Sequence, residues 1–491
     1  MAYDPRGDGQ KGLAAGDTIA AVATAVAPGQ GSVAIVRLSG PGAERIGRQL
    51  FVAPGRQRWE SHRVLYGHVV DPAGGERVDE ALLLLMRAPR SFTREDVVEF
   101  HCHGGLVAVG RVLELVLAAG ARAAAPGEFS QRAFLNGRLD LTRAEALMEL
   151  VAARSRRAAQ LAMAGLEGGL QRRINGLRER LLDQLAELEA RVDFEEDLPA
   201  LDGGAVMAAL AAVRADLAAM VAEARAGEVL REGLRVAIVG RPNVGKSSLL
   251  NRLSRRERAI VTDLPGTTRD LLESEIVLEG VPLTLLDTAG IREASDRVEA
   301  LGIERSREAL ASADAVLLVF DLAEGWTAAD QALLELAPEG VPLLRLGNKA
   351  DLLLEPLARG SGRGQAGEAA PSPQASEAMP APRRAPSPPA DLAISARSGA
   401  GIEALGPLLL NRCGVLELQG IRAALNGRQR ELAAAAAVSL GRSLEAAAAG
   451  LPWDFWTIDL RDAVRDLGAI TGEEVNEAVL DRVFSRFCIG K

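Results

Sequence analysis

The segment that most constrains the fold is Gly240-Arg-Pro-Asn-Val-Gly245-Lys246-Ser247, which directly follows the apolar run Val236-Ala-Ile-Val239. It matches G-x-x-x-x-G-K-[ST], a pattern in which a strand leads through a glycine-rich loop into a helix. Backbone N–H groups of such a loop and of the helix N-terminus surround phosphates, and the lysine reaches the outer ones. The sequence therefore predicts a P-loop nucleotide site, and the contacting residues are expected to be Asn243, Val244, Gly245, Lys246, Ser247 and Ser248.

Segments downstream of this loop fit the same site. Leu283-Thr-Leu-Leu286 runs into Asp287-Thr288-Ala289-Gly290, which places a carboxylate at a strand end and a glycine N–H where a γ-phosphate would lie. The hydroxyl of Ser247 is expected to bind Mg²⁺. From Leu234 to about Leu410 short aliphatic runs alternate with helical segments, which is typical of βαβ units around a parallel sheet.

A third motif predicts which base is bound. Asn348-Lys349-Ala-Asp351 follows another apolar run, and its aspartate can accept two hydrogen bonds from the N1–H and amine of guanine. Alone this tetrapeptide could be a helix cap. Behind a strand and in this order it favours GTP over ATP, with Ser395-Ala396-Arg397 completing the base pocket through its backbone.

Charge and composition limit the possible functions. The 491 residues carry 57 Lys+Arg and 66 Asp+Glu, a net charge of −9 that argues against binding nucleic acid over the whole surface. Only four basic residues are lysines, and two of them, Lys246 and Lys349, lie in the nucleotide motifs. Residues 130–180 hold ten arginines against five acids, which indicates either an RNA-facing surface or a solvated helix face.

Compartment and metal content are also constrained. The longest purely aliphatic stretch, Leu82 to Met86, is far shorter than the ~20 residues of a membrane span, and no signal-peptide core is visible. We therefore expect a cytoplasmic protein without stable membrane insertion. Three scattered cysteines make no disulfide framework, and His101-Cys102-His103 should alternate faces of a strand rather than bind zinc.

The pattern divides the chain into several domains, a multidomain α/β and α+β fold. Residues 1–16 read as a disordered extension and 17–135 as an α+β domain. Residues 136–228 form a helical part that opens with a capping box at Thr142-Arg-Ala-Glu145. Residues 229–416 form the nucleotide domain, interrupted by a flexible Pro-rich insertion at 355–390, and helix returns over 417–491. One helix should bury a stripe consisting of Val206, Leu210, Val213, Leu217, Met220 and Ala224.

The motifs occur in an order that resembles translation-factor-like P-loop GTPases: the P-loop, Gly266-Thr-Thr268, then the aspartate, asparagine and serine motifs above. Further segments narrow the resemblance, and the chain from Asp17 to Lys491 is similar to the MnmE (TrmE) family of tRNA modification GTPases. These segments are Arg37-Leu-Ser-Gly40, Ser91-Phe-Thr-Arg-Glu-Asp-Val-Val-Glu99, His103-Gly-Gly105, Pro126-Gly-Glu-Phe-Ser130, Phe134-Leu-Asn-Gly-Arg-Leu-Asp140, Ile260-Val-Thr-Asp263 and Cys488-Ile-Gly-Lys491.

The resemblance implies an N-terminal domain that binds folate and dimerises, and a helical domain interrupted by a Ras-like GTPase domain. It implies a GTP-hydrolysing homodimer that works with the flavoprotein MnmG, as a heterotetramer, on tRNA. The pair would add an aminomethyl or carboxymethylaminomethyl group to C5 of the wobble uridine. A formyl- or methylene-tetrahydrofolate would supply the one-carbon unit, and K⁺ would support dimerisation of the GTPase domains.

The resemblance also implies site residues. Mg²⁺ would be held by Ser247 and Thr268, and K⁺ by Asn243, Thr262, Leu264 and Thr267. Folate would be held by Arg37, Glu99, Arg138 and Lys491, although Arg138 stands where a lysine is expected. Ile291 occupies the position where many GTPases place a water-orienting glutamine, so the nearby Arg292, Asp296 and Glu299 are candidates for organising catalysis. The resemblance implies that Arg269, Asp270, Arg292 and Glu299 are the catalytic switch residues, and Cys488 of the terminal motif is a further catalytic candidate. A solvated switch segment and a buried core cysteine are the alternatives for these residues.

Two other functions are compatible with the motifs. One is a GTP switch that acts in ribosome assembly without covalent chemistry, and the other is a self-assembling structural GTPase. Neither needs the N-terminal domain or the terminal Cys488-Ile-Gly-Lys491, so these two features favour the modification enzyme.

Overall fold

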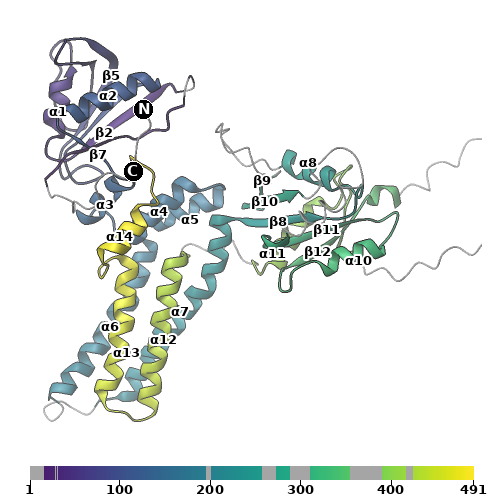
Figure 1. The fold of residues 1–491 in the computed structure, drawn as a ribbon. Coiled ribbons are helices and arrows are strands. Elements are labelled where there is room, and N and C mark those ends of the chain that lie inside the picture. The colour runs from purple at the N-terminus through teal and green to yellow at the C-terminus, as the bar shows by residue number, and fades with distance from the viewer. Residues whose placement is uncertain are drawn as a thin grey trace, which may run out of the picture. The chain divides into compact units, whose positions relative to one another are not determined.

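The computed structural model describes residues 16–27, 29, 31–194, 201–256, 273–287, 310–353, 390–415 and 424–490. Almost all of the expected N-terminal extension and of the Pro-rich insertion at 355–390 lies outside these ranges. The chain forms two compact units: the first contains residues 1–148, 165–215 and 432–491, and the second contains 149–164 and 216–431 (Figure 1).

The first unit contains a seven-stranded sheet in the order β3-β4-β5-β6-β2-β1-β7. All neighbours are antiparallel except β1 and β7. Two helices, α1 (Ala43–Leu50) and α2 (Leu106–Ala118), bury Ile46, Val109 and Val112 with the sheet in one core. The strands are β1 (Ile19–Val22), β2 (Val33–Ser39), β3 (Phe51–Val52), β4 (Arg63–Val70), β5 (Arg77–Met86), β6 (Val97–His103) and β7 (Arg122–Ala123).

Strand β6 shows the predicted alternation. Cys102 is buried in this core, whereas His101 is partly exposed and His103 is exposed. The sulfur therefore faces away from the two imidazoles, because successive residues of a strand point to opposite faces. Within the described ranges no group of three or more His, Cys, Asp or Glu side chains is placed to hold a metal ion.

The remainder of the first unit is helical. Helices α6 (Gly169–Phe194) and α13 (Trp453–Thr471) lie side by side (Figure 1). An ion pair joins them, between Arg461 and Glu189 at 2.8 Å. The other helices of the chain's helical segments are α3 (Glu128–Leu135), α4 (Leu141–Ala152), α5 (Arg156–Leu166), α7 (Gly203–Glu232), α12 (Gly427–Ala448) and α14 (Glu477–Phe484).

The prediction that a capping box at Thr142 and Glu145 starts helix α4 is wrong, because the capping residue is Asp140. Helix α4 begins at Leu141, and the side chain of Asp140 accepts the backbone N–H groups of Thr142 at 2.9 Å and Arg143 at 3.2 Å. Asp140 therefore caps the helix, because a carboxylate before the first turn satisfies its free donors better than Thr142 can from within it. Thr142 and Glu145 are buried instead.

The predicted apolar stripe is confirmed. Val206, Leu210, Val213, Leu217, Met220 and Ala224 of α7 are all buried. This helix is also long and apolar enough, by length and composition, to cross a membrane, which the search for purely aliphatic runs did not anticipate. The buried stripe shows that one face of α7 packs inside the protein, as in an amphipathic helix, while 28% of its most apolar window is buried.

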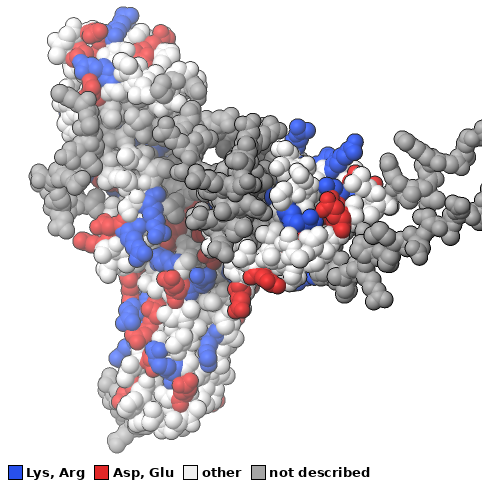
Figure 2. All heavy atoms as spheres, turned by 45° about the vertical axis from the view of Figure 1, so that its right-hand side comes forward, with Lys and Arg blue, Asp and Glu red and all other residues white. Residues whose placement is uncertain are grey.

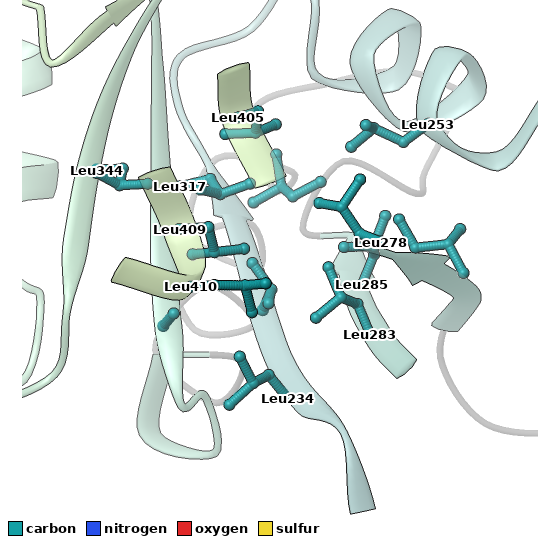
Figure 3. Packing of buried hydrophobic residues seen from close by; sticks show 14 of the residues in the cluster. Leu234, Leu253, Leu278, Leu283, Leu285, Leu317, Leu344, Leu405, Leu409 and Leu410 are labelled. Carbon is teal, nitrogen blue, oxygen red and sulfur yellow. The ribbon is translucent and has the colours of Figure 1, made fainter. Parts of the chain in front are cut away.

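The second unit is built on a six-stranded sheet in the order β13-β12-β11-β8-β10-β9, in which only β9 is antiparallel to its neighbour. Helix α11 (Leu405–Arg412) contributes Leu405, Leu409 and Leu410 to the core, beside Leu317 and Leu344 of the sheet (Figure 3). The strands are β8 (Leu234–Val239), β9 (Glu273–Leu278), β10 (Val281–Asp287), β11 (Ala315–Asp321), β12 (Leu343–Asn348) and β13 (Leu392–Ala393).

Residues 149–164 belong to this second unit, although the pattern suggested a helical segment over 136–228. Leu161 of α5 lies in the core with Val229 and Leu230, and Arg154 pairs with Glu275 of β9 at 2.9 Å. Residues 149–164 therefore pack with the six-stranded sheet of the second unit.

Candidate nucleotide-binding site

The P-loop connects the central strand β8 to helix α8 (Lys246–Arg256), as predicted. Strand β8 pairs with β10 on one side and β11 on the other, so the loop leaves the sheet at the point where the chain changes direction. Ligands of open α/β sheets bind at such a switch point, beyond the carboxyl ends of the strands. Asp321, Asn348 and Asp287 end β11, β12 and β10 at the same edge.

The loop itself has the backbone of a phosphate cradle. Asn243 has φ +62° and Gly245 has φ +99°. A Cβ on Gly245 would lie 2.2 Å from Nδ2 of Asn348, so only glycine fits at this position. Ser247 and Ser248 are exposed in the first turn of α8, where their hydroxyls and the helix N–H groups are open to a ligand.

Lys246 is buried and lies along its own loop. Its Nζ donates to the carbonyl oxygens of Gly240 at 2.6 Å and Arg241 at 2.8 Å. Two carbonyls thus hold the ammonium at the centre of the loop, from which it can reach the outer phosphates of a nucleotide.

Asn348 connects the phosphate side of the site to the base side. Its Nδ2 donates to the carbonyl oxygen of Val244 in the P-loop at 2.8 Å, and its Oδ1 accepts the backbone N–H of Ala396 at 2.9 Å. The side chain is buried. The predicted Asn348 and Ser395–Arg397 motifs are therefore brought together by a side-chain amide, which can donate one hydrogen bond and accept another at the same time.

The remaining base-side residues are also held in place. Ser395 Oγ donates to Oδ1 of Asp351 at 2.6 Å, which leaves the second carboxylate oxygen of Asp351 for a guanine. Lys349 has φ +63° and pairs with Asp321 at 2.7 Å. Burial opposes ionisation of Asp321, but the hydrogen bonds from Lys349 and from the N–H of Ala323 hold its pKa below the ordinary value.

Sequence reasoning missed two residues of this site. Arg252 of α8 donates from Nε to the carbonyl oxygen of Ala396 at 3.1 Å and also to that of Arg397, so it supports the base loop from behind. Asp321 could have been found, because it is a carboxylate at the end of an apolar strand. Nothing in the local sequence distinguishes Arg252 from the neighbouring arginines.

A second cluster joins residues expected to bind folate. Arg37 of β2 faces Glu99 of β6 in the sheet register, and Arg37 Nε donates to Oε1 of Glu99 at 2.7 Å. His101 Nε2 shares a hydrogen bond of 3.1 Å with the other oxygen of Glu99. Burial opposes ionisation of Glu99, but His101 and Arg37 hold the pKa of this carboxylate below the ordinary value.

The C-terminal segment reaches the same cluster. Arg37 donates to the carbonyl oxygen of Gly490 at 3.2 Å, and a Cβ on Gly490 would lie 2.6 Å from the carbonyl oxygen of Val22 in β1. Phe484 and Phe487 anchor the segment in a small core with Leu141 and Ala144. The chain's last described residues thus lie against the N-terminal sheet.

Comparisons with known proteins agree with this architecture. The sequence model of the MnmE helical domain matches residues 141–488, and that of the GTP-binding protein TrmE N-terminus matches residues 18–138. The tRNA modification GTPase MnmE of Synechococcus sp. (strain RCC307) is 67% identical over 476 residues, covering 97% of this chain and 98% of the relative. The protein of that name from Prochlorococcus marinus (strain MIT 9313) is 64% identical over 475 residues, covering 96% and 98%. The chain belongs to the MnmE family of tRNA modification GTPases.

Family membership gives the other predicted site residues a context. Arg138 is exposed, and within the described ranges no hydrogen bond or ion pair joins it to Arg37 or Glu99. Cys488 is exposed, so the alternative of a buried core cysteine is wrong. The remaining predicted positions lie outside the described residues: Thr262, Leu264, Thr267, Thr268, Arg269, Asp270, Thr288, Ala289, Gly290, Arg292, Glu299 and Lys491.

The arginine-rich run at 130–180 includes residues that bind carboxylates. Arg132 is buried and binds Asp17, Glu95 and Glu128. Arg178 pairs with Glu473 at 2.6 Å. On the face drawn in Figure 2, blue and red residues are interspersed along the helical part of the surface. Arg132 and Arg178 are therefore ion-paired within the fold, a role that neither the RNA-facing surface nor the solvated helix face anticipated.

Proposed function

We propose that this chain is the GTP-hydrolysing subunit of a tRNA modification complex that acts at C5 of the wobble uridine. The observation that carries the proposal is the bridge made by Asn348 between Val244 of the P-loop and Ala396 of the base loop. This bridge assembles a guanine nucleotide site in a chain whose relatives are named tRNA modification GTPases.

The chain's own residues divide the work of binding GTP. Lys246 and the N–H groups of the P-loop hold the outer phosphates, while Asp351 and the backbone of Ser395, Ala396 and Arg397 select guanine. Ser247 carries an exposed hydroxyl of the kind Mg²⁺ takes, with Thr268 as the second protein ligand. Bound Mg²⁺ would neutralise charge that develops on the phosphates. Glu299 would orient water, assisted by Arg269, Asp270 and Arg292.

Potassium is the cation we propose for stimulation of hydrolysis. Asn243, Thr262, Leu264 and Thr267 offer side-chain and backbone oxygens, the donors that suit this ion. The backbone of Asn243 is in the left-handed region, with φ +62°, and the residue is exposed. Its side chain is therefore accessible to an ion. Bound K⁺ would supply positive charge as two GTPase domains of a homodimer meet.

The cluster at Arg37 is the proposed folate site, with Glu99, Arg138 and Lys491. A carboxylate can accept about four hydrogen bonds. Glu99 accepts one from Arg37 and shares one with His101, so positions remain for the donor edge of a pterin. The guanidinium of Arg37 lies 5.8 Å from the ring centroid of Phe129, which gives the cluster an aromatic wall. A bound formyl- or methylene-tetrahydrofolate would supply the one-carbon unit.

The proposal extends to organisation and partners. We propose a folate-binding, dimerising domain over 17–135, a helical domain over 136–228 and 417–491, and a GTPase domain over 229–416 inserted between the helices. MnmG and tRNA would be the partners, and the group added would be aminomethyl or carboxymethylaminomethyl. We propose a cytoplasmic protein, in which α7 packs one apolar face inside the protein and does not span a membrane.

Mass spectrometry of tRNA nucleosides tests the modification. Cells that lack the protein should lose the aminomethyl-type group at the wobble uridine, and the wild-type gene should restore it. Restoration by Cys488→Ser would exclude a chemical role for this exposed thiol. If the nucleoside profile of the deletion strain is unchanged and no redundant enzyme is present, the modification function is refuted. The result would then favour a GTP switch in ribosome assembly.

Two measurements on the purified chain test the cofactors. GTP turnover should be faster in potassium than in sodium at equal ionic strength, and equal rates would refute the cation site. Calorimetry should detect binding of a formyl-tetrahydrofolate that Arg37→Ala weakens, with Arg58→Ala, an exposed arginine of the same domain, as the matched control. Equal binding by both variants would remove Arg37 from the site.

A further inference from the structure

Arg241, the second residue of the P-loop, is tied to a helix outside the loop. Its Nε donates to Oδ1 of Asp330 at 2.8 Å, and its NH1 donates to Oε2 of Glu324 at 3.0 Å. Asp330 lies in helix α10 (Ala328–Glu335) and its side chain is fully buried, whereas Glu324 is exposed. The bond to Asp330 is therefore the shielded one, and a buried pair is screened by salt much less than a surface pair.

The carboxylate that receives Arg241 is itself immobilised. Asp330 Oδ2 accepts the backbone N–H of Thr327 at 2.9 Å and its hydroxyl at 2.7 Å, and the Thr327 side chain caps α10 in return. This reciprocal capping box fixes the rotamer of Asp330 with respect to the helix. Arg241 is thus held by an acceptor that cannot follow it if the loop moves.

The main chain of the same arginine also binds Lys246, the phosphate-binding lysine of the loop. The carbonyl oxygens of Gly240 and Arg241 both accept hydrogen bonds from Lys246 Nζ. Gly240 lies tight against the sheet, because a Cβ there would lie 2.2 Å from the carbonyl oxygen of Val319. One carbonyl is consequently fixed by packing on β11, and the other depends on the backbone of Arg241.

We propose that Arg241 is a positioning residue for Lys246. By anchoring its side chain on Asp330, it fixes the carbonyl that directs the ammonium of Lys246 towards the outer phosphates. The anchor needs a guanidinium, because the planar fork serves Asp330 and Glu324 together, whereas a lysine is a single point charge. The proposal rests on GTP hydrolysis at this loop.

The test compares Arg241→Gln with a matched variant in the same unit, Arg345→Gln. Arg345 makes two hydrogen bonds to Asp391, at 3.0 and 3.1 Å, and lies in β12 three residues before Asn348. Both substitutions remove one Arg–Asp pair. GTP turnover, GDP affinity and the unfolding temperature are measured for each full-length variant, together with the ratio of GDP to IDP affinity.

We expect Arg241→Gln to lower kcat by about tenfold or more and to weaken GDP binding. The GDP-to-IDP ratio should stay within about twofold, because Asp351 and the base loop are held separately by Ser395 and Asn348. Arg345→Gln should lower only the unfolding temperature. Arg241→Lys keeps the positive charge but loses the planar guanidinium, so it should give a kcat between those of the wild type and Arg241→Gln. If Arg241→Gln does not fold, Arg241→Lys is compared with Arg345→Gln instead.

Equal kcat in the Arg241 and Arg345 variants would overturn the proposal, as would a loss of guanine preference in Arg241→Gln. An inactive wild-type chain would instead refute GTP hydrolysis as the function. In that case GDP affinity alone would still show whether Arg241 holds the loop.

Discussion

Asn348 Nδ2 donates a hydrogen bond of 2.8 Å to the carbonyl oxygen of Val244. This bond joins the last residue of strand β12 to the P-loop, which follows strand β8. The two residues are 104 positions apart in the sequence. Because the same amide group also accepts from Ala396, one buried side chain sets the spacing between the phosphate pocket and the base pocket. A change at Asn348 should therefore affect both pockets.

Asn348→Ala should leave the carbonyl of Val244 and the N–H of Ala396 buried without their partner. Loss of these two bonds is expected to cost about 2 kcal/mol or more, which corresponds to about 30-fold weaker GDP binding. A fluorescent GDP analogue measures this affinity. Asn476→Ala, which removes the N-cap of α14, is the control and should destabilise the protein with unchanged nucleotide binding. Equal affinities in both variants would contradict the bridging role.

Gly245→Ala should disable the P-loop. The added methyl would lie 2.2 Å from Asn348 Nδ2, and φ at this residue is +99°. Backbone strain of this kind costs on the order of 1–3 kcal/mol, so GTP turnover should fall at least about tenfold. The control is Gly176→Ala in α6, where the new Cβ meets nothing within 4 Å. That substitution should stabilise its helix by about 0.5–1 kcal/mol and leave turnover unchanged.

Arg87→Gln should make the N-terminal domain less stable near neutral pH only. The hydrogen bond from Arg87 holds the pKa of Glu44 at about 2, against an ordinary value of 4.5, with Arg48 contributing. A lowered folded-state pKa means that ionised Glu44 stabilises the fold above about pH 4.5, and that this contribution is lost as the pH falls towards 2. Since the pair is largely exposed, solvent screens it and the loss of stability should be small.

Urea unfolding at pH 7 and at pH 2.5 measures this difference. The gap between wild type and Arg87→Gln should shrink as the solution becomes acidic. Arg58→Gln is the control, because Arg58 makes an exposed contact of 3.7 Å with Glu60. A gap that persists at the lower pH would show that Arg87 stabilises the domain by packing rather than through the charge of Glu44.

The three cysteines should differ in reactivity. Burial raises the pKa of Cys102 to about 12 and that of Cys413 to about 11, whereas Cys488 is exposed. Because the thiolate is the reactive form, a disulfide reagent at pH 8 should modify one thiol of the native protein rapidly and all three after denaturation. Cys488→Ser should abolish the rapid phase. Two rapid thiols in the wild type would mean that one buried cysteine is accessible.

Much of the nucleotide site could be predicted because its motifs are local. The eight consecutive residues from Gly240 to Ser247 encode the conformation of the phosphate-binding loop. The four residues from Asn348 to Asp351 contain the side chains of the predicted guanine-binding motif. The buried stripe from Val206 to Ala224 was predicted for the same reason, since helical spacing alone defines a face. The cap of α4 was misplaced, because Asp140 and Thr142 are both suitable capping residues and only the backbone shows where the helix begins.

The sequence by itself determined the P-loop site, its order of motifs, the preference for guanine and the helical segments on either side of the nucleotide domain. Only the tertiary structure decided which distant residues meet. Asp330 receives Arg241, Arg252 supports Ala396, and Gly490 reaches Arg37 across 453 positions. The reason is that a local sequence pattern determines the backbone conformation and the face of the helix or strand on which each side chain lies. Contacts between distant residues depend instead on strand order and helix packing.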